Sequence, residues 1–211
     1  MGAIYNATWG RAFAALYDRG LKATEEGGLR EMRRELLSQA SGRTVDLGAG
    51  TGVNLDLFPD AVNELVMVEP DPHMLKQLRA KAGDRGGVEI VGASAQELPF
   101  ADDSFDTAVF TLVLCTVPDP DAALHEAARV LKPGGKLLFI EHVRAGEAGL
   151  AGWQDRLEKP WRFLADGCHC NRDTVTMIEG SPLKLERVES GQLPKAPPIV
   201  RPLVSGSAVA A

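Results

Sequence analysis

The segment that most constrains the fold is 45–52, Val-Asp-Leu-Gly-Ala-Gly-Thr-Gly, where a short apolar run leads directly into a turn with three glycines. Gly48, Gly50 and Gly52 can adopt backbone angles that are closed to other residues, and they let a ligand lie against the main chain. Asp46 adds a carboxylate at the end of the run, which suits a cationic ligand that carries a nucleoside. The G-x-G-x-G spacing differs from the G-x-G-x-x-G spacing of dinucleotide-binding turns. The segment therefore predicts a buried strand followed by a ligand-binding turn.

Downstream of this turn the sequence alternates between strand and helix patterns. We expect strands at 44–48, 64–69, 88–92, 105–114 and 136–143, with helices between them. Asp71 followed by Pro72 is typical of a helix start, because an aspartate side chain caps free backbone N–H groups and proline fits the first turn. Two amphipathic helices, separated at Gly27-Gly28, precede the first strand. This order predicts an α/β fold with a largely parallel sheet.

The alternation ends after the fifth expected strand. Residues 144–181 form a long insertion, which we expect to cap the site. Two apolar stretches, 183–188 and 202–209, are joined by a connection too short for a helical crossover and should pair antiparallel. The predicted sheet is mostly parallel with one antiparallel C-terminal strand, and helices cover both of its faces. We expect a single domain over 1–211, with N-terminal helices or a lid at 1–43, a core at 44–143, a cap at 144–182 and a strand pair at 183–211.

Composition narrows the class of ligand and the compartment. The chain has 211 residues and a formal net charge of −6 without a long basic run, so a nucleic-acid substrate is not expected. No apolar run approaches the roughly 20 residues of a membrane span, and the N-terminus has no signal-peptide pattern. Three cysteines fit reduced thiols better than a disulfide framework. We therefore expect a cytoplasmic protein without a membrane span that acts on a small molecule; its oligomeric state is left open.

Ligands of an open parallel sheet bind beyond the carboxyl ends of its strands. The second expected strand ends at Glu69, which lies 17 residues beyond Gly52, close to the spacing of an acid that holds ribose hydroxyls. The third leads into the polar segment 93–97, and the fourth and fifth end near Thr111 and His142. These strand ends predict a nucleoside pocket whose reacting group lies above the fourth and fifth strands.

Four segments together resemble class I S-adenosylmethionine (SAM) methyltransferases over residues of about 44–143. They are the glycine turn, the acid at Glu69, the segment 93–106 with its L-P-F and S-F-D motifs, and R-V-L-K-P-G-G at 129–135. Ser94 stands where an aspartate is common in that class. The resemblance implies a Rossmann-like sheet, SAM as cofactor and S-adenosyl-L-homocysteine as product. The cofactor-binding residues that it implies are Asp46, Gly48, Ala49, Gly50, Gly52, Asn54, Glu69, Pro70, Ser94, Ala95 and Thr111.

Further motifs resemble the methyltransferase-like alkyl thiol S-methyltransferase family and extend the resemblance nearly end to end. They are T-L-V-L-C at 111–115, E-H-V at 141–143, W-Q at 153–154, P-W at 160–161, D-G-C at 166–168 with Arg172 beyond, and R-P…G-x-A-V at 201–209. Animal members carry a hydrophobic N-terminal membrane anchor, and we expect this chain to be a soluble relative without it. The resemblance implies methyl transfer to a small thiol. Two alternatives stay open: transfer to oxygen or nitrogen of a natural-product or quinone-like acceptor, and SAM binding without catalysis.

Four residues are candidates for catalysis: His142, Asp166, Cys168 and Arg172. His142 could take a proton or orient the acceptor, or it could simply bond backbone groups at the strand end. Asp166 or His169 could draw off a proton, and Arg172 could hold an anionic substituent of the acceptor. Alternatively, these polar side chains could stabilise their own loop.

A metal site is a further hypothesis. Cys168-x-Cys170 with His169 between them suits a soft ion, because thiolates favour such ions. Two neighbouring ligands do not make a tetrahedral site unless Cys115 converges with them. Cys115 is otherwise expected in the core. No metal is therefore predicted.

Aromatic residues near the N-terminus share one helix face. Trp9, Phe13 and Tyr17 recur at helical spacing. They could close over the cofactor and exclude water, or form the apolar face of a packed helix, or do both.

Overall fold

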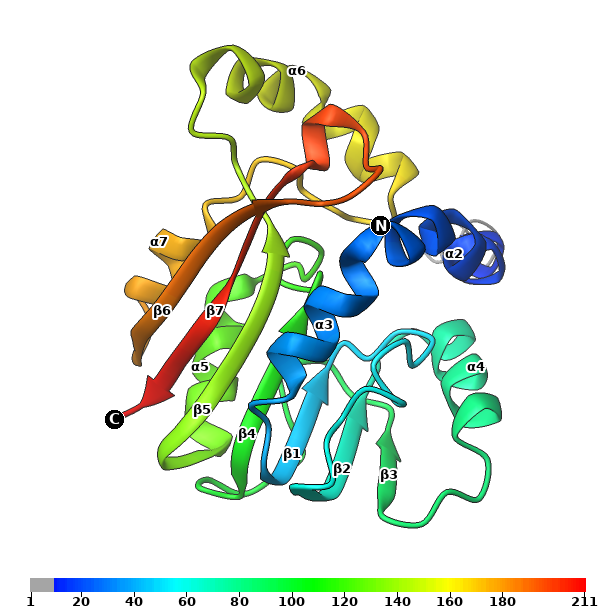
Figure 1. Ribbon diagram of the computed structural model, residues 1–211, viewed down its shortest axis with the longest axis vertical. Helices are drawn as coiled ribbons and strands as arrows, with labels where there is room; N and C mark the ends of the chain where they lie inside the picture. The colour runs from blue at the N-terminus through cyan, green and yellow to red at the C-terminus, as the bar shows by residue number, and fades with distance from the viewer. Residues whose placement is uncertain (1–9) are drawn as a thin grey trace.

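One seven-stranded sheet organises residues 10–211, the part of the chain that the computed structural model describes (Figure 1). The described strands are β1 (Gly42–Leu47), β2 (Val62–Val68), β3 (Val88–Val91), β4 (Phe105–Thr111), β5 (Leu131–His142), β6 (Leu183–Gln192) and β7 (Pro202–Ala210). The described helices are α2 (Arg11–Thr24), η2 (Glu25–Leu29), α3 (Arg30–Leu37), α4 (Pro72–Ala82), α5 (Pro120–Val130), α6 (Ala148–Leu164), α7 (Thr174–Glu179) and η3 (Pro198–Val200).

The strands lie in the order β3-β2-β1-β4-β5-β7-β6. β1 pairs in parallel with both β2 and β4, so the winding of the chain reverses at this strand. β7 pairs antiparallel with β5, from Lys136 opposite Val209 to His142 opposite Leu203, and antiparallel with β6 on its other side. The predicted sheet, mostly parallel with one antiparallel C-terminal strand, is confirmed. The reversal at β1 marks the position where open α/β sheets bind ligands.

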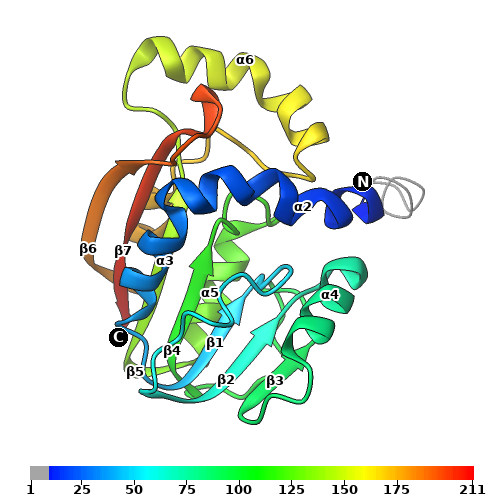
Figure 2. The same ribbon diagram turned by 45° about the vertical axis from the view of Figure 1, so that its right-hand side comes forward.

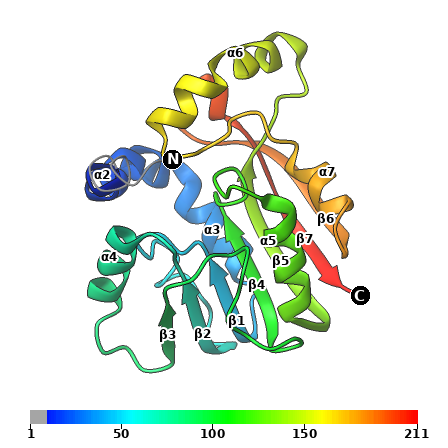
Figure 3. The ribbon, with the colours of Figure 1, turned by 180° about the vertical axis from the view of Figure 1, so that it is seen from behind.

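Helices cover both faces of the sheet, as predicted. α3 lies on the face turned toward the viewer in Figure 1, and α5 and α7 lie on the opposite face, which Figure 3 shows. Side chains along β5 alternate between two apolar cores. Leu137 and Phe139 belong to the core that includes Leu124 of α5, whereas Leu138 and Ile140 belong to the core on the α3 side. Burial on both faces explains why β5 is a continuous apolar run in the sequence.

Two helices, α2 and α6, lie beyond the carboxyl ends of the parallel strands (Figure 2). They belong to the segments at 1–43 and 144–182. Among residues 10–211, no helix is both long enough and apolar enough to cross a bilayer.

Several helix boundaries follow the sequence signals. The chain bends between α2 and α3 at Gly28, whose φ is 133°, which confirms the break predicted at Gly27-Gly28. The helix start predicted at Asp71 is confirmed as well, because its side chain accepts hydrogen bonds from the backbone N–H groups of His73 and Met74. Capping of this kind satisfies donors that have no partner within the helix.

The helices expected between β1 and β2 and between β3 and β4 do not form; these predictions were wrong. After β1 the chain makes successive tight turns, in which the N–H groups of Gly52 and Leu55 bond the carbonyls of Ala49 and Gly52. The positive φ values of Gly48, Gly50 and Gly52 are incompatible with a right-handed helix at this point. β5 also begins at Leu131, earlier than the 136 expected, because the strand includes the Pro-Gly-Gly segment that follows α5.

Candidate active site

A cavity of about 780 Å³ lies at the carboxyl ends of β1, β2 and β5 and the loop after β4, with residues of α2 and α6 lining its other sides. It therefore lies at the switch point of the sheet, where the fold class places its ligands. The predicted site residues that line it are Gly48, Gly50, Glu69, Pro70, Ser94, Ala95, His142, Asp166 and Cys168. Among the described residues, those predicted for the site but placed outside this lining are Asp46, Ala49, Gly52, Asn54, Thr111 and Arg172.

Aromatic side chains of α2 form one wall of the cavity. Phe13 and Tyr17 line it, with their ring centroids 5.5 Å apart. The hydroxyl of Thr51, in the glycine turn, donates a hydrogen bond to Asp18 at 2.6 Å and so ties α2 to the turn. Trp9, predicted on the same face, lies outside the described residues. The helix thus packs against the turn and covers the cavity at the same time.

Gly48 brings bare main chain to the cavity wall. Its φ is 70°, a left-handed conformation that favours glycine. A Cβ atom at this position would lie 2.6 Å from Cγ1 of Val113, in the loop after β4. The position therefore requires glycine for its backbone angle and for its contact with Val113.

Glu69 braces the glycine turn from the end of β2. Its Oε2 accepts the N–H of Gly50 at 2.8 Å, and its Oε1 accepts the N–H of Asp71 at 2.8 Å. Burial raises the pKa of Glu69, although both N–H donors act to lower it. Each carboxylate oxygen has capacity for a further hydrogen bond. Glu69 can therefore receive hydroxyl donors from a molecule in the cavity.

A buried polar network lies beside the glycine turn. The Asn54 amide donates to both oxygens of Asp46, at 3.2 and 3.1 Å, and to the hydroxyl of Thr111 at 2.9 Å. Arg33 of α3, only 1% exposed, donates to the Asn54 carbonyl oxygen and to Glu25, both at 3.1 Å. Burial raises the pKa of Asp46 to about 7. Asp46, Asn54 and Thr111 thus support the turn from within the protein.

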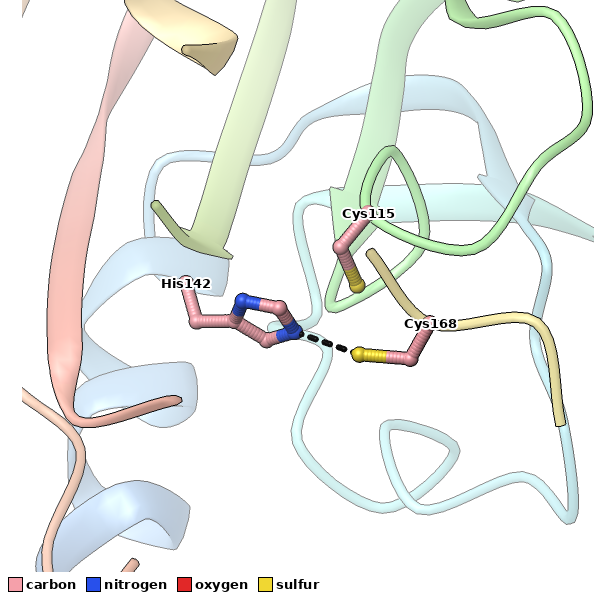
Figure 4. A group of neighbouring side chains, drawn as sticks. All are labelled: Cys115, His142 and Cys168. Carbon is pink, nitrogen blue, oxygen red and sulfur yellow. Dashed lines mark hydrogen bonds between the residues drawn. The ribbon is translucent and has the colours of Figure 1, made fainter. Parts of the chain in front are cut away.

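Three side chains with potential ligand atoms converge near the ends of β4 and β5 (Figure 4). Nε2 of His142 lies 2.9 Å from Sγ of Cys168, and the indole N–H of Trp161 donates to the same sulfur at 3.2 Å. One ligand atom each from Cys115, His142 and Cys168 lie within 4.8 Å of one another. A hydrogen bond with Cys168, together with burial, raises the pKa of the Cys115 thiol.

The neighbours of Cys168 in sequence point elsewhere. The Cys170 thiol donates to the backbone carbonyl of Gln154 at 3.5 Å, and Nδ1 of His169 lies 2.9 Å from a carboxylate oxygen of Glu158. The combination of Cys168, His169 and Cys170 that was considered as a metal site therefore does not form a cluster. A turn begins at Cys170, and its sulfur contacts the backbone of α6 at Gln154. Cys115 is buried, as expected of a core residue, and it also lies beside Cys168 at the cavity.

Glu141 holds the loop that carries Cys115, a role that sequence analysis missed. Its fully buried carboxylate accepts the N–H groups of Val113, Leu114 and Cys115 at 2.8, 3.0 and 3.3 Å. The Arg172 guanidinium donates to two carbonyl oxygens of the same loop. Both side chains therefore position the loop. A glutamate within an otherwise apolar strand end was the sequence signal that could have indicated this role.

The sequence and fold of this chain are similar to those of known methyltransferases. Residues 45–139 match the family described as "Methyltransferase domain". The chain is 34% identical over 197 residues to human thiol S-methyltransferase TMT1B, covering 84% of this chain and 78% of that protein. It is 37% identical over 160 residues to the rat TMT1B, covering 70% of this chain and 65% of that protein.

A Thermotoga maritima structure, described as a SAM-dependent methyltransferase and possible histamine N-methyltransferase, aligns with a TM-score of 0.71 at 23% identity. The alignment covers 95% of this chain and 98% of that one. At this identity the likeness concerns the fold.

The sheet order, the glycine turn and these matches define a class I SAM-dependent methyltransferase. Within this class, the chain belongs to the family of the thiol S-methyltransferases TMT1A and TMT1B. It spans just under two thirds of the rat relative, 65% of that protein's length.

Proposed function

We propose that this protein transfers the methyl group of SAM to the sulfur of a small thiol. The observation that carries the proposal is one cavity that joins Glu69 to Cys115, His142 and Cys168, in a chain of the thiol S-methyltransferase family. A nucleoside and an acceptor could occupy this space together. In this proposal residues 144–182 form the acceptor cap of a single catalytic domain.

The residues around the glycine turn suit the nucleoside half of SAM. The free lone pairs of Glu69 would accept the ribose hydroxyls, while Gly48 and Gly50 leave the main chain bare beside the cofactor. Ser94 and Ala95 line the same cavity and would contact adenine, as the family resemblance implies. SAM supplies a methyl group on a positively charged sulfur, which an entering nucleophile displaces in line.

The acceptor side is apolar and shielded. Phe13, Tyr17 and Trp161 line the cavity, so a bound acceptor would be kept from bulk water. A thiol is a few per cent ionised at neutral pH and is strongly nucleophilic, so the main task of the site is alignment. His142 is buried, and its Nδ1 has no hydrogen-bond partner among the described residues. It is our candidate for orienting the thiol, either by taking its proton directly or by holding the acceptor in another way.

The direct test is incubation of the protein with methyl-labelled SAM and a panel of small thiols, phenols and amines. We expect label on thiols, detected as thioethers by mass spectrometry. Label on phenols or amines alone would reject S-methylation. SAM binding without transfer to any acceptor would favour a non-catalytic role.

We expect Glu69→Ala to weaken SAM binding about 10- to 100-fold. Charge-assisted hydrogen bonds contribute about 1.5–3 kcal/mol each, and the ribose would lose its acceptor. Isothermal titration calorimetry would measure the affinity, with Glu89→Ala as the control, because Glu89 is exposed on β3. An affinity equal to that of the control would remove Glu69 from the cofactor site.

We expect His142→Ala to slow methyl transfer about 100-fold or more, which is the usual contribution of a positioned acid or base. SAM affinity should change less than about threefold, a difference worth under 0.7 kcal/mol. Single-turnover rates and binding would be measured on the same samples. His125→Ala is the matched control, because His125 lies exposed on α5. A rate that stays at the wild-type value would exclude His142 from the reaction.

A further inference from the structure

Cys115, His142 and Cys168 come from three separate parts of the chain and meet at one point. Cys115 lies in the loop after β4, His142 ends β5, and Cys168 follows α6. Figure 4 shows the two sulfur atoms and Nε2 of His142 directed toward one another. All three residues are buried, and all three line the cavity. The cluster is thus closed on the protein side and faces the proposed acceptor space.

Two thiols and an imidazole form a ligand set typical of Zn²⁺. Zn–S bonds of about 2.3 Å and Zn–N bonds of about 2.0 Å place tetrahedral ligand atoms roughly 3.5 Å apart. In the structure the ligand atoms lie within 4.8 Å of one another, and Nε2 of His142 is 2.9 Å from Sγ of Cys168. Small side-chain rotations would therefore convert the present contacts into coordination of one ion.

The surroundings also suit bound thiolates. The indole N–H of Trp161 already donates to the Cys168 sulfur, as outer hydrogen-bond donors do in metal sites. The Arg172 guanidinium donates to the carbonyl oxygens of Leu114 and Val117, so a positive charge lies on the loop that carries Cys115. Two thiolates would neutralise the charge of one Zn²⁺, so the buried site would carry no uncompensated charge.

We propose that Cys115, His142 and Cys168 bind Zn²⁺ with three protein ligands, and that the open fourth position binds the sulfur of the acceptor thiol. Catalytic zinc sites keep such an open position, whereas structural sites have four protein ligands. This inference rests on the proposed S-methylation and names how its acceptor is held.

The step balances as a simple displacement. In this arrangement His142 holds the acceptor through the ion instead of taking its proton, and the acceptor thiol loses its proton to solvent as its sulfur binds the ion. A sulfur lone pair then forms the new bond to the methyl carbon, and the bond from that carbon to the SAM sulfur breaks. The bonding electrons stay with the departing sulfur, which becomes a neutral thioether. The methylated acceptor is also a neutral thioether and a weaker ligand, so it leaves the ion.

The test uses the full chain, freed of metal by chelator, and Co²⁺ as a spectroscopic probe. We expect one Co²⁺ per chain, with the absorption of a tetrahedral thiolate complex, and Zn²⁺ should displace it. Addition of 2-mercaptoethanol should then change this absorption as a third sulfur joins the ion. Cys115→Ser and Cys168→Ser should each weaken metal binding at least about 100-fold. Cys170→Ser is the matched control and should bind as the wild type, because Cys170 lies outside the cluster.

A second measurement needs no variant and guards against loss of folding. Zn²⁺ should slow alkylation of Cys115 and Cys168 at least about 10-fold in the wild type, and mass spectrometry would compare them with Cys170. Absence of stoichiometric binding, or equal effects at all three cysteines, would overturn the site. Metal binding without a spectral response to the thiol would overturn the acceptor role. The metal-binding and alkylation readouts need no SAM, so they test the zinc site separately from S-methylation. Thiol methylation by metal-free protein, measured with SAM, would refute the zinc proposal and leave S-methylation standing.

Discussion

Gly48→Ala is expected to weaken SAM binding at least about 100-fold and to abolish detectable methyl transfer. The left-handed backbone at this position, with φ of 70°, costs an alanine about 1–2 kcal/mol. Its Cβ would also lie 2.6 Å from Cγ1 of Val113, far inside contact distance. Val113 has little freedom to move, because its N–H is bonded to the buried carboxylate of Glu141. The turn itself would therefore shift into the cavity.

Calorimetric titration with SAM and the single-turnover rate would both measure this effect. Gly83→Ala is the matched control, because Gly83 has a φ of 56° but nothing within 4 Å of its added Cβ. That variant would also place an alanine at a positive φ, at the end of α4 and away from the cavity lining. Similar SAM affinities for the two variants would show that the contact between Gly48 and Val113 does not shape the site.

Glu141→Ala is expected to lower the free energy of unfolding by about 3–5 kcal/mol. The substitution leaves three backbone N–H groups without their acceptor, and each buried unpaired group costs about 1–3 kcal/mol. The loop also contains Leu112 at a φ of 61°, an unfavourable conformation that the surrounding bonds maintain. Cys115 would lose its fixed position with the loop, so transfer should fall as well.

Urea unfolding followed by circular dichroism would measure the stability. Glu141→Gln should lose less free energy of unfolding, because its amide oxygen can still accept some of the three backbone N–H groups. Glu64→Ala is the surface control; its ion pair with Arg43 is partly exposed, and we expect a change below about 1 kcal/mol. A loss for Glu141→Ala as small as that of Glu64→Ala would contradict the role assigned to this carboxylate.

The sheet was predictable because its signals are local. Apolar runs bounded by turn residues located the five parallel strands, and Asp71-Pro72 located the start of α4. The absence of a helix after β1 was harder to predict from sequence, because the turns that replace the helix are held by tertiary hydrogen bonds. Asn54 is tied to Asp46 and Thr111, and these contacts between distant residues favour turns over a helix. The placement of β7 between β5 and β6 also depends on pairing between segments that are far apart in the sequence.

Some residues of the candidate site could also be predicted from local sequence signals, whereas others could not. Glu69 and the glycines could be found by spacing alone, and the structure places Glu69, Gly48 and Gly50 together in the cavity lining. Whether they bind SAM stays a prediction. The grouping of Cys115 with His142 and Cys168 could not be read from sequence, because it depends on how the loop after α6 folds back over β4 and β5.

The position of β7 has a consequence for biosynthesis. β6 leaves the ribosome before β7, yet within the described sheet it pairs only with β7. Until β7 inserts beside β5, the nascent chain therefore exposes two unpaired strand edges, those of β5 and β6. We expect this late step to be the interval in which the chain is most open to proteases and to association with other copies of itself.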